Sequence, residues 1–165
     1  MIKVNLLNSN FRLNSLEKNK IKNQIKYYED SRSVSIEALK IVQKERGWIC
    51  DEAIFAISKL LGVSVVDIES VATFYNQIFR QPVGKNIIRY CDSIVCFING
   101  YKDIQMLLEN ILAIKTGETT QDGMFTLLPT CCLGNCDQSP VLMINDDMHF
   151  CVTPKLIPNL LDSYK

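Results

Sequence analysis

Cysteine is the residue type in this sequence whose number and spacing most clearly indicate chemistry. The chain has seven cysteines, and five of them lie within 46 residues, at Cys91, Cys96, Cys131, Cys132 and Cys136. The number is odd, and the start of the chain lacks the apolar stretch and cleavage site of an export signal, which argues against a framework of disulfide bonds. Cysteines clustered in this way predict a metal site or a redox site.

Two cysteine pairs have the spacing of metal ligands. Four residues separate Cys91 from Cys96, and three separate Cys132 from Cys136. Four thiolates suit zinc or an iron–sulfur cluster, and zinc knuckles use gaps of about two to four residues, so the spacing is compatible with zinc. Pairs on two separate loops fit the larger footprint of a diiron core better. A redox dithiol and plain buried cysteines are the remaining interpretations, and the absence of Cys-x-x-Cys weakens the first of these.

Two short strands are expected to deliver these cysteines. Residues 86–90 predict a strand that leads directly into Cys91, and residues 124–128 predict a second strand just before the other pair. If the two strands are neighbours in one sheet, both loops emerge at the same edge and the four thiolates converge. Gly134, inside the second loop, would let backbone amides approach a sulfur closely. This part of the chain is expected to form a β-α-β-β-α unit. Its other elements are a helix over residues 100–114, a hairpin of residues 141–145 and 149–152, and a helix starting at Pro154.

The first 80 residues have helical periodicity instead. Four helices are expected, with the second and third ending at Gly47 and Gly62 and the fourth opening on a capping box of Ser64 and Asp67. The segment 80–84, Arg-Gln-Pro-Val-Gly, breaks this pattern. The sequence therefore predicts a helical bundle over residues 1–80 and a second domain over residues 81–165, an α+β or α/β architecture.

Composition and motifs exclude several classes of protein. The 165 residues are 47% hydrophobic and 22% charged, and 18 basic side chains balance 18 acidic ones, so neither disorder nor nucleic-acid binding is expected. No stretch is long and apolar enough for direct membrane insertion, and no glycine-rich nucleotide motif is present. Residues 1–90 carry a net charge of +5 and residues 91–165 a net charge of −5. The basic half and the acidic half of the chain are therefore expected to contact different partner surfaces.

The remaining histidine and cysteines are interpreted as structural residues. His149, the only histidine, lies beside the expected hairpin turn, and Cys50 and Cys151 are interpreted as small apolar core residues.

Four motifs together resemble one family. They are residues 72–76 (Ala-Thr-Phe-Tyr-Asn), 80–84, 91–96 (Cys-Asp-Ser-Ile-Val-Cys) and 128–136 (Leu-Pro-Thr-Cys-Cys-Leu-Gly-Asn-Cys). They resemble the 24 kDa-type subunit, known in bacteria as the E-type subunit, of respiratory NADH:quinone oxidoreductase (complex I), and the likeness covers roughly residues 12–163. The resemblance implies an N-terminal helical bundle followed by a thioredoxin-like [2Fe-2S] ferredoxin domain.

The resemblance also implies a site and a function. It implies that Cys91, Cys96, Cys132 and Cys136 bind one [2Fe-2S] cluster, which exchanges single electrons with the flavin of a partner NADH-oxidising subunit. The family pattern has a ligand directly before Leu-Gly, which selects Cys132 and makes Cys131 a non-ligand. NADH and FMN are then bound only by the partner subunit, this chain holds no catalytic residue, and no activity is expected of the isolated chain.

The same resemblance indicates partners and location. It implies contact with the flavin- and NADH-binding subunit and with other peripheral-arm subunits, in a cytoplasmic position on the inner side of the bacterial inner membrane. Two alternatives stay open: an equivalent relay subunit of an NAD-linked hydrogenase or formate dehydrogenase, and a zinc-bound thioredoxin-like interaction module.

Overall fold

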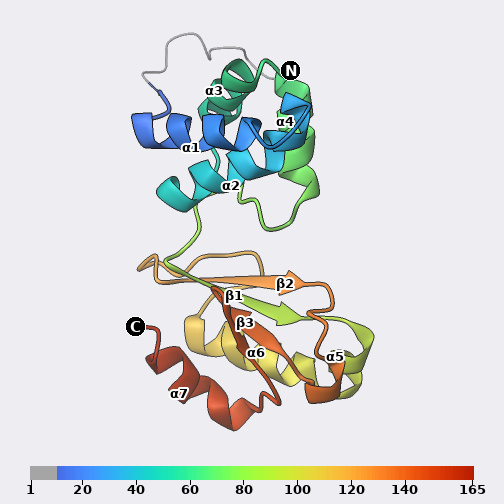
Figure 1. Ribbon diagram of the computed structural model, residues 1–165. Helices are drawn as coiled ribbons and strands as arrows, with labels where there is room; N and C mark the ends of the chain where they lie inside the picture. The colour runs from blue at the N-terminus through green and yellow to red at the C-terminus, as the bar shows by residue number, and fades with distance from the viewer. Residues whose placement is uncertain (1–10) are drawn as a thin grey trace. The chain divides into compact units, whose positions relative to one another are not determined.

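The computed structural model describes residues 11–165, and the chain divides into two compact units (Figure 1). The first unit ends at Pro82 and the second begins at Val83, whereas the sequence predicts a boundary between residues 80 and 81. The described part of the first unit is helical, and the second combines helices with a four-stranded sheet. Between residues 11 and 165, no helix has the length and apolar character needed to cross a membrane.

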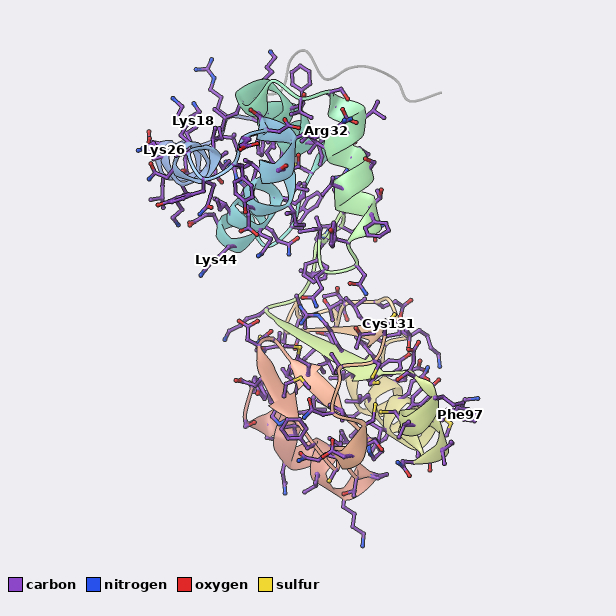
Figure 2. All side chains as sticks on the ribbon, turned by 45° about the vertical axis from the view of Figure 1, so that its right-hand side comes forward. Lys18, Lys26, Arg32, Lys44, Phe97 and Cys131 are labelled. Atoms are coloured by element: carbon purple, nitrogen blue, oxygen red, sulfur yellow. The ribbon has the colours of Figure 1, made fainter. Side chains whose placement is uncertain are left out.

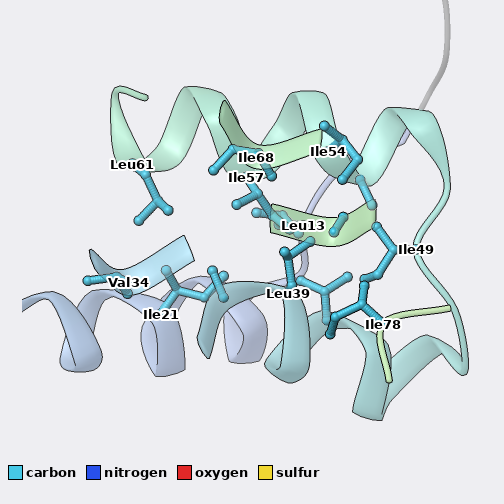
Figure 3. Packing of buried hydrophobic residues seen from close by; sticks show 14 residues of the cluster. Leu13, Ile21, Val34, Leu39, Ile49, Ile54, Ile57, Leu61, Ile68 and Ile78 are labelled. Atoms are coloured by element: carbon cyan, nitrogen blue, oxygen red, sulfur yellow. The ribbon is translucent and has the colours of Figure 1, made fainter. Parts of the chain in front are cut away.

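Between residues 11 and 82, the helical unit contains four α-helices and one short 3-10 helix. They are α1 (Ser15–Ile25), η2 (Ser31–Val34), α2 (Ser35–Arg46), α3 (Asp51–Leu61) and α4 (Val65–Phe74). Their apolar faces meet in one core (Figure 3), whose largest fully buried side chains include Ile21, Leu39, Ile49, Ile54, Ile57 and Ile68. The lysines of α1 stay exposed, as Lys18 illustrates in Figure 2, and so does Lys26 at the end of the helix.

Local signals in the sequence account for the ends of these helices. Asn14 caps α1 by accepting from the Glu17 amide, while the Glu17 carboxylate accepts from the Asn14 amide, both at 2.7 Å. Gly47 and Gly62 end α2 and α3 with positive φ angles of 85° and 68°, which glycine adopts without a Cβ penalty. The predicted helix ends at these two glycines are confirmed.

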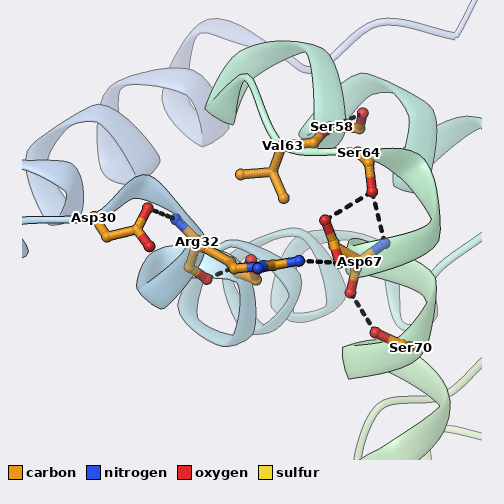
Figure 4. A network of polar contacts seen from close by, with 8 residues as sticks. Asp30, Arg32, Ser58, Val63, Ser64, Asp67 and Ser70 are labelled. Carbon is orange, nitrogen blue, oxygen red and sulfur yellow. Dashed lines mark hydrogen bonds and ion pairs between the residues drawn. The ribbon is translucent and has the colours of Figure 1, made fainter.

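An ion pair ties η2 to the start of α4 (Figure 4). The Arg32 guanidinium donates to the Asp67 carboxylate, which also accepts from the Ser64 hydroxyl at 2.7 Å. The Ser64 oxygen in turn accepts from the Asp67 amide at 3.1 Å, so Ser64 caps α4 as predicted. In a full capping box the Asp67 carboxylate would also accept from the Ser64 backbone amide. Here the short aspartate side chain accepts from the Ser64 hydroxyl and not from the Ser64 amide.

The second unit is built on a sheet with strand order β2-β1-β3-β4. Its strands are β1 (Asn86–Cys91), β2 (Phe125–Thr130), β3 (Leu142–Ile144) and β4 (Asp147–His149). The connection from β1 to the parallel strand β2 carries the helices α5 (Ile94–Ile98) and α6 (Tyr101–Leu112). Later come η3 (Cys136–Gln138), η4 (Pro154–Leu156) and α7 (Ile157–Asp162), and α6 packs against β1, β2 and α7.

The parallel pairing of β1 with β2 sets where the cysteines emerge. Cys91 lies opposite Thr130 in the register, and the Asp92 amide donates to the Thr130 carbonyl at 3.1 Å. Both strands therefore end at the same edge of the sheet. The prediction that the two cysteine loops leave one sheet edge is confirmed.

In this unit one local prediction is wrong and one helix was not predicted. The hairpin turns at Asn145 and Asp146, so its second strand is residues 147–149 and not 149–152. Asn145 takes a positive φ of 55°, which suits a two-residue hairpin turn and shortens the loop. The helix α5, which begins between Cys91 and Cys96, has no counterpart in the sequence prediction, because five residues are too few to show a periodic pattern.

Candidate metal centre

The first cysteine pair is buried at the end of β1. Cys91 is the last residue of that strand and Cys96 lies on α5, and each is 2% exposed. The Cys91 amide donates to the Val141 carbonyl at 3.1 Å, which fixes the strand end against the segment before β3. A backbone hydrogen bond from Val141 also reaches the Cys96 thiol. Both cysteines are thus tied to the backbone of Val141 in the buried part of the site.

The second pair lies on the loop after β2, nearer to the surface. The sulfurs of Cys132 and Cys136 are 3.3 Å apart, with Cys132 exposed and Cys136 half-buried. Between them Gly134 has a φ of 91°, a conformation that turns its amide back toward the Cys132 sulfur at 3.4 Å. The expectation that Gly134 lets a backbone amide approach a sulfur is confirmed.

The thiols of the two loops affect one another. Burial raises the pKa of Cys96 to about 11, and its neighbours Cys91 and Cys136 contribute to the rise. Burial also raises the pKa of Cys91, but hydrogen bonds from the Ser93 side chain, the Ser93 backbone and the Leu133 backbone outweigh it and leave that pKa lowered. The Leu133 bond links the second loop to a sulfur of the first, so the two loops converge on one site.

The arrangement in pairs bears on which metal group fits. Among residues 11–165, no three His, Cys, Asp or Glu side chains gather as a single metal ion needs. Two thiolates bound tetrahedrally to one metal, each at about 2.3 Å, lie about 3.8 Å apart, and the 3.3 Å between Cys132 and Cys136 is close to this separation. The other pair, Cys91 with Cys96, lies at the same sheet edge, and two pairs from two separate segments would suit the larger footprint of a diiron core better than one tetrahedral zinc.

The other sulfur-bearing and titratable candidates lie apart from this arrangement. Cys131 is exposed (Figure 2) and makes no hydrogen bond with another cysteine of the described chain. Cys50 is half-buried and packs against the helical core, as expected. The expectation of a buried Cys151 is wrong: β4 ends at His149, and Cys151 follows in an exposed turn with a φ of 48°. His149 bonds the Tyr164 hydroxyl at 3.0 Å, a structural contact.

Comparison with known proteins identifies the family. The model of the thioredoxin-like [2Fe-2S] ferredoxin family matches residues 21–165. The E-type subunit of NADH-quinone oxidoreductase from Buchnera aphidicola of Acyrthosiphon pisum is 64% identical, and the corresponding Escherichia coli K12 protein is 60% identical. Both alignments cover 94% of this chain, with 96% and 93% of the respective relatives. The chain belongs to the thioredoxin-like [2Fe-2S] ferredoxin family.

Solved structures show the same fold in another setting. An NAD+-reducing [NiFe]-hydrogenase in the air-oxidised state matches 68% of this chain with a TM-score of 0.62 and 25% identity. The hydrogen-reduced state matches 76% with a TM-score of 0.67 and 24% identity, a likeness of fold alone. This chain spans only 20% and 22% of those two hydrogenase chains.

Family membership settles part of what the sequence predicts. The predicted thioredoxin-like fold and the prediction of one [2Fe-2S] cluster as cofactor are confirmed. The ligand set Cys91, Cys96, Cys132 and Cys136 stays a prediction. Sequence reasoning missed the side-chain donor beside the sulfurs, Ser93. Its position two residues after the first cysteine of a pair is the signal that could have found it.

Proposed function

We propose that this chain is the [2Fe-2S] electron-transfer subunit of an NADH:quinone oxidoreductase. The observation that carries the proposal is the convergence of two cysteine pairs, Cys91 with Cys96 and Cys132 with Cys136, at one edge of a thioredoxin-like sheet. The near-full-length identity to E-type subunits of this oxidoreductase supports the choice of host complex. These four thiolates are the proposed ligands, and Cys131 is a bystander.

The residues around the two cysteine pairs each have a task in this proposed function. A bound [2Fe-2S] cluster supplies the chemistry, since it takes up and releases one electron at a time at low potential. The buried Cys91 and Cys96 would hold the cluster from the interior, and Cys132 and Cys136 would hold it from the side nearer to the surface. Backbone amides of Leu133 and Gly134 hydrogen-bond the sulfurs and so stabilise their negative charge.

The proposed electron partner is the flavin- and NADH-binding subunit of the same complex. NADH and FMN bind there, and this chain contributes no catalytic residue of its own, so the isolated chain has no NADH-oxidising activity. Other peripheral-arm subunits complete the assembly on the cytoplasmic side of a bacterial inner membrane. The outer pair, exposed Cys132 and half-buried Cys136, marks the side on which a partner approaches the cluster most closely.

A relay role in an NAD-linked hydrogenase is the second candidate. The observation that favours it is the fold match to an NAD+-reducing [NiFe]-hydrogenase at 25% identity. The identities of 64% and 60% to E-type subunits favour the quinone reductase. Purification of the chain with its native partners distinguishes the two, since either quinone-reductase subunits or a nickel-containing subunit will accompany it.

Metal analysis with a pair of adjacent cysteine variants tests the cluster and its ligands. We expect two irons and two acid-labile sulfides per chain, with a rhombic electron paramagnetic resonance (EPR) signal after dithionite reduction. Cys132→Ala should lose iron and signal, while its sequence neighbour Cys131→Ala should keep both. One zinc and no sulfide would refute the electron-carrier function. Loss of the cluster in Cys131→Ala with retention in Cys132→Ala would overturn only the ligand assignment.

A further inference from the structure

Ser93 is placed as if to cap a helix but does not cap it. It is the N-cap residue of α5, with extended backbone angles, and its side chain makes no capping hydrogen bond. Its carbonyl accepts from the Phe97 amide at 2.9 Å, so the backbone alone begins the helix. Serine at this position usually turns its oxygen to the free amides of the first turn. Here the hydroxyl is directed elsewhere.

The Ser93 hydroxyl faces the sulfurs of both loops. Its oxygen lies 3.2 Å from the Cys91 sulfur, and it is also within hydrogen-bond reach of the Cys132 thiol. Cys91 comes from β1 and Cys132 from the loop after β2, so one hydroxyl sits between one proposed ligand of each pair. Metal-bound cysteines are thiolates without a proton. Toward such sulfurs the hydroxyl can act only as a donor.

We propose that Ser93 is a tuning residue, whose hydroxyl donates a hydrogen bond to a cluster ligand and thereby raises the reduction potential. This inference rests on the proposed function, because it assumes a cluster on these cysteines. By formal charge, a [2Fe-2S] centre with four thiolates goes from about −2 to about −3 on reduction. A hydrogen bond to a ligand sulfur stabilises the more negative state more strongly, and hydrogen bonds to the sulfurs are one of the levers that set such potentials.

Ser93→Ala removes this donor with little other change. The side chain is only partly buried and has no capping bond to lose, and the backbone bond from Phe97 is retained. We expect the equilibrium constant for one-electron reduction to fall about three- to tenfold, a potential about 28–59 mV more negative. Ser93→Thr keeps a hydroxyl at the same position and should stay within about twofold of the original chain.

The test is an EPR-monitored redox titration of the full-length chain carrying its cluster, with iron and sulfide measured on each sample. Ser163→Ala is the matched control, because the Ser163 hydroxyl donates to the Leu160 carbonyl in the same unit and touches no cysteine. Its potential should equal that of the unchanged chain. If Ser93→Ala fails to hold the cluster, Ser93→Gly removes the same hydroxyl, and glycine is well tolerated at an N-cap.

The outcomes separate this inference from the proposed function. An unchanged potential in a fully loaded Ser93→Ala chain overturns the tuning role and leaves the electron-carrier function standing. A shift in Ser93→Thr as large as that in Ser93→Ala overturns it too, since the hydroxyl is then not the cause. Absence of two irons and of the EPR signal from the unchanged chain refutes the proposed function instead.

Discussion

The buried carboxylate of Glu17 offers a sharp test of what holds the helical unit together. Its side chain is fully buried, and Arg46 of α2 donates to it twice, at 2.6 Å and 2.8 Å. The Asn14 amide donates at 2.7 Å as well. Arg46 also bonds the Arg12 carbonyl at 3.0 Å, so one guanidinium joins α2 to the chain before α1. We predict that Arg46→Met strongly destabilises this unit.

The magnitude follows from what the substitution leaves behind. Removing one partner of a buried ion pair costs about 3–5 kcal/mol, because the other charge stays buried without compensation. Because the Arg46 side chain is 28% exposed, we expect the free energy of unfolding to fall by about 3 kcal/mol, the lower end of this range. With a urea slope of about 2 kcal/mol/M, the unfolding midpoint should fall by about 1.5 M.

Tryptophan fluorescence measures this loss selectively. Trp48 is the only tryptophan of the chain and lies in the helical unit between α2 and α3, so urea unfolding followed at Trp48 reports on that unit. Lys20→Met is the matched control, because the Lys20–Glu45 pair has a similar 2.7 Å contact but is exposed. The free energy of unfolding of Lys20→Met should fall by less than about 1 kcal/mol. Equal midpoints for the two variants would refute the argument from burial.

The same pair predicts how the difference depends on pH. Burial raises the pKa of Glu17, but the Arg46 and Asn14 hydrogen bonds outweigh it, so the folded pKa lies below the ordinary value of 4.5. A carboxylate with a lowered folded pKa stabilises the fold above 4.5, and this contribution is lost as the pH falls through the folded value. In Arg46→Met the burial effect prevails and the folded pKa of Glu17 lies above 4.5. The gap between the original chain and Arg46→Met should therefore be full at pH 7, begin to shrink above pH 4.5 as Glu17 of the variant takes up a proton, and close as the pH falls through the lowered pKa of the original chain.

Three further perturbations probe the second unit. Gly84→Ala places a Cβ 2.9 Å from backbone atoms of Phe125, and we expect a loss of about 1–3 kcal/mol in thermal unfolding followed by circular dichroism. Leu127→Ala opens a cavity at a fully buried position and should cost about 2–5 kcal/mol in the same assay. Hydrogen bonds from Lys115 and its neighbours lower the pKa of Glu109 to about 2; an NMR titration should find this midpoint, and Lys115→Met should raise it.

Much of the fold was predictable because its signals are local. Gly47 and Gly62 mark helix ends through backbone freedom, and Ser64 marks a helix start through its side-chain oxygen. Apolar runs over residues 86–90 and 124–128 located the strands β1 and β2 to within about two residues. The second strand of the hairpin was placed wrongly and α5 was not predicted. A positive φ at Asn145 and a helix of only five residues do not show in the pattern of apolar residues.

The site shows a similar division. Spacing alone paired Cys91 with Cys96 and placed the second pair on another loop, which the parallel register of β1 and β2 brings to the same edge. Spacing could not decide between Cys131 and Cys132, since both precede Cys136 by a plausible gap. Cys132 stays the proposed ligand, and its sulfur lies 3.3 Å from that of Cys136, a proximity that depends on the loop conformation at Gly134.

The unequal burial of the two pairs bears on how a partner would influence the cluster. Cys91 and Cys96 are already shielded from water, whereas Cys132 is exposed. A partner protein that covers the outer pair removes water from the side where the reduced state is still solvated, and desolvation disfavours the more negative state. Water can then no longer serve as a donor to these sulfurs. If Ser93 acts as proposed, fixed donors such as its hydroxyl and the Gly134 amide would carry a larger share of the stabilisation in such a complex than in the free chain.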